Sequence, residues 1–303
     1  MTLDLTSPVL AAVLARLRVR FGDRVDAWWQ ALPDRLPELA GRWDLAIGDP
    51  VGRGNTSLVL RCRHAGAPAI LKLVPDPALA VAEVDALEAW QASGRVPRVH
   101  RFDPCVGALV MEAIETPTTL GELPGAASLE EVALLIRDLH RASPATTFEP
   151  LPSRVEFMFS RCAARLLSTE GGTDAIPLGV LEASRLLALR LASSPSPSVL
   201  LHGDLHPGNL LAGAPGRGLV VIDPRPCTGD ASFDAIDFVF WPEGTPDDWS
   251  RRRRQLAARL GWDPDRLRDW CRAVAVVFAV GQVAKGASRG AVQPFLDLAP
   301  SIA

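Results

Sequence analysis

Apolar and polar positions divide the chain into a first part of mixed pattern and a second part that is mainly helical. Residues 7–30 and 79–92 carry apolar side chains at helical spacing. Between them, residues 57–62 and 69–74 alternate or are rich in β-forming side chains, and residues 106–114 have the pattern of a further strand pair. We therefore predict an N-terminal lobe that is built on a small sheet and contains one inserted helix.

Helical spacing dominates after residue 117. The predicted helices cover residues 128–141, 153–168, 178–193, 247–260 and 264–285. Two short apolar runs, 198–202 and 218–223, end in polar side chains and are predicted to be strands. The pattern as a whole indicates an α+β fold with two lobes, the second of them mainly helical.

Composition excludes several classes of protein. The chain has 303 residues, 48% hydrophobic side chains and a formal net charge of −3, which excludes global disorder and a general nucleic-acid binder. Its longest apolar stretch, residues 273–280, is too short to span a bilayer, and its N-terminus lacks the basic start of a signal peptide. The five scattered cysteines are expected to be buried, reduced thiols. We therefore expect a cytoplasmic protein without nucleic-acid or membrane partners.

Lysine is rare in this chain. Thirty arginines stand against two lysines, Lys72 and Lys285, and arginine does not replace lysine where a compact ammonium group is required. Lys72 lies in a predicted strand, where a lysine that orients nucleotide phosphates is expected. Glu83 on the following helix is its predicted partner and Glu88 is the alternative. Because the two carboxylates lie about 140° apart around a helix, only one of them can face the lysine.

The segment 202–209, HGDLHPGN, carries the strongest signal for chemistry. Asp204 is followed five positions later by Asn209, which is the spacing of a phosphotransferase catalytic loop. In such a loop the Asp accepts the proton of a substrate hydroxyl and the Asn binds Mg²⁺. Asp223, at the end of the second apolar run, would be the other metal ligand, because Mg²⁺ prefers a few hard oxygen ligands.

Two other functions remain possible from these residues alone. His202, Asp204 and His206 form an H-x-D-x-H pattern, which also occurs in metal hydrolases, although His202 is better explained as a structural residue that braces the loop. A kinase-like protein that binds its ligand without catalysis is the other alternative. The presence of Lys72, Asp204 and both predicted metal ligands argues against it.

A glycine-rich turn precedes the first clear strand of the N-terminal lobe. Its residues 52–57, GRGNTS, would cover phosphates with backbone N–H groups. The residues that we select for nucleotide contact in this turn are Gly52, Gly54, Asn55 and Ser57.

These residues, in this order, resemble the aminoglycoside phosphotransferase family, whose fold is similar to that of eukaryotic protein kinases. Within the family, the nearest resemblance is to the streptomycin 6-kinases and hydroxyurea resistance kinases. The stretches that carry it are Trp28 with Leu32 and Pro33, WDL at 43–45, AILKL at 69–73, ALEAW at 86–90 and IDPRPCTGDASFD at 222–234. The chain departs from the protein-kinase pattern at HGD (202–204) and DPR (223–225), and both departures suit a small-molecule kinase without a phosphorylated activation loop.

The resemblance implies a protein-kinase-like, two-lobe fold. It would have a nucleotide-binding lobe with an antiparallel sheet over residues 1–111, a hinge at 112–116, and a helical lobe with the catalytic loop and substrate site over 117–303. It implies that Asp204 is the catalytic base, that Asn209 and Asp223 bind magnesium, and that the hinge lies behind the adenine. The hinge residues assigned to the nucleotide are Glu112 and Ile114.

The implied activity is that of an antibiotic resistance kinase. It would transfer the γ-phosphate of ATP, or of GTP, to a hydroxyl of a small cationic aminoglycoside and would require Mg²⁺. The expected acceptor is streptomycin, phosphorylated at its 6-hydroxyl, and the alternative is another small molecule such as hydroxyurea. The expected assembly is a monomer or a homodimer.

The segment after the predicted metal ligands concentrates negative charge. Residues 221–248 contain seven acidic side chains and one basic one. Carboxylates there would attract a cationic acceptor and pair with guanidinium groups, of which streptomycin carries two. We select Asp230, Asp237 and Glu243 as substrate-facing residues. Asp234 is assigned instead to a structural role, in which it accepts backbone N–H bonds near the catalytic loop.

Overall fold

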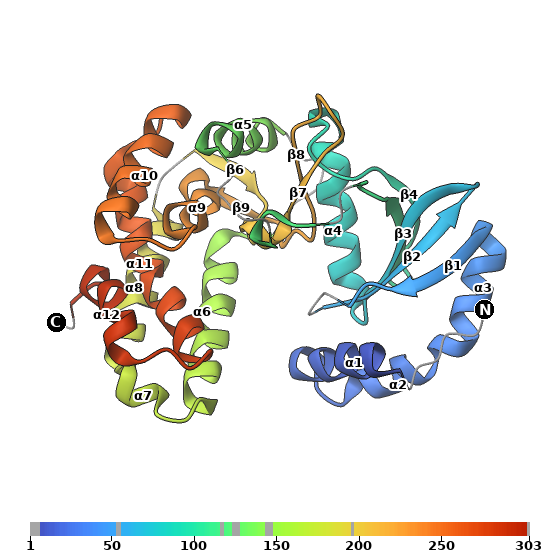
Figure 1. Cartoon of the computed structure of the whole chain (residues 1–303), viewed down its shortest axis with the longest axis horizontal. Helices are drawn as coiled ribbons and strands as arrows, with labels where there is room; N and C mark the ends of the chain where they lie inside the picture. The colour runs from blue at the N-terminus through green and yellow to red at the C-terminus, as the bar shows by residue number, and fades with distance from the viewer. Residues whose placement is uncertain are drawn as a thin grey trace. The chain divides into compact units, whose positions relative to one another are not determined.

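The computed structural model describes residues 7–52, 56–115, 118–122, 128–142, 148–194 and 197–301. Contacts divide the chain into two compact units, Met1–Pro117 and Thr118–Ala303. The division falls one residue beyond the predicted hinge at 112–116. The α+β fold class is confirmed, since the first unit holds an antiparallel sheet and the second is mainly helical (Figure 1).

The first unit is built on a five-stranded antiparallel sheet. Its strands are β1 (Leu45–Pro50), β2 (Leu58–His64), β3 (Ala67–Leu73), β4 (Val99–Asp103) and β5 (Ala108–Glu112), in the order β1-β2-β3-β5-β4. The prediction of a strand pair within 106–114 is wrong, because only β5 lies there and its partner β4 precedes it. β4 is an edge strand with polar side chains at His100, Arg101 and Asp103, so it lacks a clear apolar pattern.

Three helices precede the sheet where the sequence predicted one. They are α1 (Pro8–Phe21), α2 (Arg24–Gln30) and α3 (Leu32–Trp43). The predicted helix over 7–30 is interrupted at Gly22, whose φ of +67° lies in the left-handed region. α3 was missed because of its two prolines: Pro33 is tolerated in the first turn, but Pro37 lies inside the helix. Its buried face, which ends at Trp43, holds it against the sheet.

Side chains of the central strands alternate between two apolar clusters. Ala108 and Val110 of β5 belong to the cluster formed with α1, α2 and α3, whereas Leu109 and Met111 pack with α4 (Pro77–Trp90). The sheet is therefore covered by helices on both faces, as the period of two along a strand requires.

The second unit is a helical body with two small sheets (Figure 1). Its helices are α5 (Leu129–His140), α6 (Leu151–Ser168), α7 (Gly172–Ala175), α8 (Leu178–Ser193), α9 (Ile236–Phe240), α10 (Pro246–Leu260), α11 (Pro264–Val283) and α12 (Arg289–Leu298). All five predicted helices are present, while α7, α9 and α12 were not predicted. α11 buries ten side chains and packs against α6, α8 and α12. Among the described residues, no helix is long and apolar enough to cross a membrane.

The two small sheets each pair two short strands. β6 (Ser198–Leu201) pairs with β9 (Cys227–Asp230), and β7 (Leu210–Ala212) pairs with β8 (Leu219–Val221), both antiparallel. The predicted strands at 198–202 and 218–223 are thus present as β6 and β8. The segments that leave β6 and flank the β7–β8 hairpin carry the predicted catalytic and metal-binding residues.

The five cysteines are all free thiols. Four are buried as predicted, at positions 62, 162, 227 and 271, but Cys105 is exposed. Cys105 lies in the turn between β4 and β5, where its N–H donates to Asp103 Oδ1 at 2.9 Å. The expectation of burial is therefore wrong for this one thiol, because a turn offers no core to pack against.

Candidate active site

Lys72 and Glu83 form a buried ion pair in the first unit. Lys72 lies between Leu71 and Leu73 on β3, and since those neighbours face the N-terminal helices, Lys72 faces α4. Its Nζ lies 2.7 Å from both Glu83 Oε1 and Oε2, and the two side chains are only 5% and 3% exposed. Glu88 is exposed on the same helix. The prediction that Glu83 is the partner of Lys72 is confirmed.

The other predicted nucleotide contacts of this unit are described only in part. Gly54 and Asn55 lie outside the described residues. The carbonyl of Gly52 accepts a 2.8 Å hydrogen bond from Arg16 Nη2, which ties this end of the turn to α1, and Ser57 is buried. A phosphate contact by this turn stays a prediction.

The predicted hinge begins at the end of β5. The Oε2 of Glu112 accepts the N–H of Arg98 at 3.1 Å, and its own N–H donates to the carbonyl of Arg98 at 2.8 Å. Ile114, two residues on, is half-buried. These bonds fix the backbone where the sheet ends, and contact with the nucleotide base stays a prediction for both residues.

In the second unit, Asp234 binds the backbone of the predicted catalytic loop. Its carboxylate is buried and accepts the N–H groups of His202 at 2.8 Å and Gly203 at 2.9 Å. His140 Nε2 donates to it at 2.9 Å. Burial alone would raise the pKa of Asp234, but these bonds lower it below its usual range. The predicted structural role of Asp234 is confirmed.

Gly203 occupies a position that only glycine fits. Its φ is +73°, and a Cβ there would lie 2.0 Å from the carbonyl oxygen of Arg225. The HGD sequence that replaces the HRD of protein kinases therefore has a local cause, because a side chain at the middle position would meet the backbone that follows Asp223.

His202 is a structural residue within this loop. It is fully buried, its Nε2 donates to the carbonyl of Ile222 at 3.1 Å, and its Nδ1 accepts the N–H of Asp204 at 3.3 Å. Burial lowers its pKa to about 4, so the ring is neutral near pH 7. Because both ring nitrogens are used inside the protein, His202 has none left for zinc, which removes the basis of the metal-hydrolase alternative.

Asn209 and Asp223 lie at the same end of the β7–β8 hairpin. Asn209 directly precedes β7, Asp223 follows β8 by two residues, and the Ile222 N–H donates to the Asn209 carbonyl at 3.0 Å. The amide nitrogen of Asn209 donates to the carbonyl of Asp204 at 2.9 Å, and no described residue donates to its amide oxygen. The donor set of one amide and one carboxylate oxygen fits Mg²⁺, which keeps several waters and phosphate oxygens as its other ligands.

The acidic segment contains one predicted substrate contact that the structure assigns elsewhere. Asp230 is buried, and its Oδ2 accepts from Arg266 Nε at 2.5 Å and from the Trp270 indole N–H at 2.8 Å. Its Oδ1 accepts the N–H of Ser232 at 2.9 Å. With both oxygens bonded, Asp230 is a structural residue that joins β9 to α11, instead of the predicted substrate contact.

Asp237 and Glu243 remain candidates for the acceptor side. Asp237 lies in the first turn of the short helix α9, is partly buried, and has no hydrogen bond to its carboxylate among the described residues. Burial raises its pKa to about 7; His206 opposes this rise, and the carboxylates of Asp204 and Asp234 add to it. Glu243 is exposed in the segment between α9 and α10.

The pKa shifts of His202 and Asp237 give a prediction for the stability of the protein in acid. His202 has a folded pKa of about 4 against 6.5 as its ordinary value, so below pH 6.5 the unfolded chain binds a proton that the folded chain does not. The contribution of His202 to the free energy of unfolding therefore falls by about 3 kcal/mol as pH drops from 6.5 to 4. Asp237, whose pKa is raised to about 7, acts in the opposite direction over the whole of this range, but its contribution is present in wild type and in the His202 variant alike. We therefore expect denaturant unfolding of wild type and His202→Asn to show a stability difference that shrinks from pH 7 to pH 4.5; parallel pH curves would contradict the assignment.

Arg154 is the residue of this site that the sequence analysis missed. It lies in the first turns of α6, and it donates from Nε to the carbonyl of Gly203 at 2.8 Å and from Nη2 to Asp204 Oδ1 at 2.9 Å. No spacing signal marks it, because it is one of thirty arginines and stands fifty residues before the loop that it contacts.

Comparison with known proteins identifies the family of this chain. Residues 42–286 match the family model described as "Aminoglycoside/hydroxyurea antibiotic resistance kinase". The chain belongs to this family. It is 30% identical over 246 residues to a streptomycin 6-kinase of Streptomyces glaucescens, covering 77% of this chain and 72% of the relative. It is 29% identical over 264 residues to a hydroxyurea phosphotransferase of Kitasatospora aureofaciens, covering 86% and 76%.

Solved structures confirm the kinase-like fold of this family member. A thermostable mutant of aminoglycoside phosphotransferase APH(4)-Ia, in a ternary complex with AMP-PNP and hygromycin B, superposes with a TM-score of 0.60 at 15% identity, covering 88% of this chain and 98% of that one. The choline kinase LicA from Streptococcus pneumoniae gives a TM-score of 0.57 at 17% identity, covering 86% and 95%. At these sequence identities, the structural similarity is evidence for the fold only.

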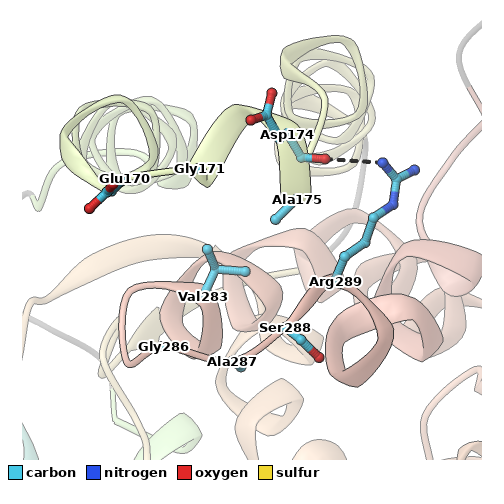
Figure 2. Close-up of a pocket in the computed structure, with 9 residues that line it drawn as sticks. All are labelled: Glu170, Gly171, Asp174, Ala175, Val283, Gly286, Ala287, Ser288 and Arg289. Atoms are coloured by element: carbon cyan, nitrogen blue, oxygen red, sulfur yellow. Dashed lines mark hydrogen bonds between the residues drawn. The ribbon is translucent and has the colours of Figure 1, made fainter.

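The kinase also has a pocket that contains none of the predicted site residues. It has a volume of about 450 Å³ and lies between the α7 region and the turn from α11 to α12 (Figure 2). Its lining residues are Glu170, Gly171, Asp174, Ala175, Val283, Gly286, Ala287, Ser288 and Arg289. Figure 2 shows Arg289 directed at the carbonyl of Asp174, to which its Nη1 donates at 3.0 Å. This guanidinium therefore joins α12 to α7.

Proposed function

We propose that this kinase transfers the γ-phosphate of ATP to a hydroxyl of an aminoglycoside, with the 6-hydroxyl of streptomycin as the first candidate and GTP as an alternative donor. The observation that carries the proposal is the loop in the second unit. There a partly exposed carboxylate, Asp204, is held by its backbone beside the Asn209–Asp223 pair. This is the arrangement that a phosphotransferase needs for a general base next to a metal site.

Each residue has a defined role in this proposal. Asp204 aligns the acceptor hydroxyl and accepts its proton late in the transfer, while Lys72, oriented by Glu83, binds the nucleotide phosphates. Asn209 and Asp223 would hold Mg²⁺, which when bound neutralises charge on the phosphates. The rate enhancement then comes mainly from positioning and electrostatics, since this chain forms no covalent bond to the transferred group.

Hydroxyurea is the second candidate acceptor. The observation in its favour is the 29% identity to a hydroxyurea phosphotransferase, which extends over 86% of this chain. The two acceptors differ in charge, because streptomycin carries two guanidinium groups and hydroxyurea is neutral. Charge therefore provides the experimental distinction.

A salt series with two acceptors tests the proposal. We expect Mg²⁺-dependent ATP consumption with streptomycin. In assays run above pH 7, where Asp237 is mostly ionised, we expect the kcat/KM for streptomycin to fall as ionic strength rises, because carboxylates at Asp237 and Glu243 attract a cation over a Debye length of about 8 Å at 0.15 M. Asp237→Asn and Glu243→Gln should each reduce this salt dependence. Phosphorylation of hydroxyurea in preference to every aminoglycoside, with a flat salt dependence, would instead assign the second candidate.

A further inference from the structure

The arginine on the catalytic carboxylate is the feature of the second unit to which the proposed function gives no role. Arg154 is 15% exposed and Asp204 37% exposed, so the pair stands at the edge of the protein where an acceptor can still reach the carboxylate. The guanidinium makes two directed bonds from one side chain, to a backbone carbonyl and to a carboxylate oxygen. An ordinary surface ion pair has no such second anchor.

The two bonds restrict different parts of the loop. The bond from Nε to the Gly203 carbonyl at 2.8 Å fixes the guanidinium relative to the backbone that carries Asp204. The bond from Nη2 to Oδ1 at 2.9 Å then fixes the carboxylate itself. No other described residue donates to the Asp204 carboxylate, so this bond is what selects its rotamer and leaves Oδ2 available.

We propose that Arg154 is a positioning residue that holds Asp204 by Oδ1 so that Oδ2 is presented to the acceptor hydroxyl. This inference rests on the proposed role of Asp204 as the base. Displacing a general base by about 1 Å lowers the rate on the order of 10²-fold. An aspartate side chain has two rotatable bonds, so a carboxylate without this hydrogen bond samples larger displacements than that. The contribution of Arg154 therefore appears in kcat and acts entirely through Asp204.

A double-mutant cycle separates this role from its alternatives. Arg154→Met should lower kcat by about 10- to 100-fold while the KM values for nucleotide and acceptor change by less than about threefold. In an Asp204→Asn background the same substitution should change kcat by less than about twofold, because nothing remains to be positioned. Arg161→Met is the matched control, since Arg161 is exposed on the same helix and makes no hydrogen bond to the described residues of the loop.

Arg154→Lys keeps the experiment decisive even where the methionine variant does not fold. Lysine keeps the charge but cannot place two N–H donors in the geometry of the fork, so we expect a kcat between those of wild type and Arg154→Met, with the melting temperature of wild type. A further tenfold loss on adding Arg154→Met or Arg154→Lys to Asp204→Asn would overturn the proposal, because it would show an independent role. An unchanged kcat in Arg154→Met and Arg154→Lys alone would also overturn the proposal. A failure of the proposed function would give a different result, because Asp204→Asn alone would then turn over at the wild-type rate.

Discussion

Asp204→Asn is expected to lower the kcat of this kinase by about 10²- to 10⁴-fold, the range for loss of a general base. An amide of the same size cannot accept the proton of the acceptor hydroxyl. The loop should keep its structure, because it is held through the backbone: Asp234 accepts the N–H groups of His202 and Gly203, and Asn209 donates to the carbonyl of residue 204. Nucleotide affinity should therefore remain close to that of wild type.

The measurement is a steady-state assay of purified protein with a matched control. Nucleotide binding and melting temperature are recorded alongside kcat, so that a loss of fold is recognised. Asp265→Asn is the control, since Asp265 is exposed in the first turn of α11 and lies outside the loop. Turnover of Asp204→Asn at the level of this control would refute the assignment of the base.

The buried pair in the first unit gives the second large effect. Glu83→Ala should destabilise that unit by about 3–5 kcal/mol, because it leaves the buried ammonium of Lys72 without its carboxylate. The double variant Lys72→Met with Glu83→Leu should regain most of this stability, since apolar side chains of similar size can replace a buried ion pair at little cost. It should nevertheless have no kinase activity, because no cation remains to bind the nucleotide phosphates.

Denaturant unfolding and kinase assays on wild type, Glu83→Ala and the double variant check this prediction. Lys285→Arg serves as the control, as the other lysine of the chain and one without an assigned role. A double variant that is stable and still active would show that the pair is structural and that Lys72 does not act on the nucleotide.

That the groups of the predicted catalytic loop lie close together could be derived from sequence, because they belong to one continuous piece of chain. Asp204, Asn209 and Asp223 belong to a loop and the hairpin that follows it, so local spacing determines their arrangement. The Lys72–Glu83 pair was predictable only in part: a helix period of 3.6 allows one of Glu83 and Glu88 to face the lysine, but it does not say which.

Partners that join distant segments escaped prediction. Arg154 reaches the loop from α6, and Arg266 and Trp270 reach Asp230 from α11. Nothing in the local pattern around Asp230 distinguishes a carboxylate that faces a ligand from one that caps a turn and binds a helix. The density of acidic residues therefore gave too many substrate-facing acids, because it does not show which carboxylates are hydrogen-bonded within the protein.

The alternation along β3 makes the first unit of this kinase sensitive to insertions and deletions within the strand. A single residue inserted between Ala67 and Lys72 would reverse every side chain beyond it, turning the ammonium toward the core under α1–α3 and an apolar side chain toward Glu83. Substitutions on this strand can be absorbed by repacking, but insertions and deletions cannot. We therefore expect relatives to differ in length at turns such as Ala65–Gly66, where both residues already adopt a left-handed φ, and to keep the strand itself constant.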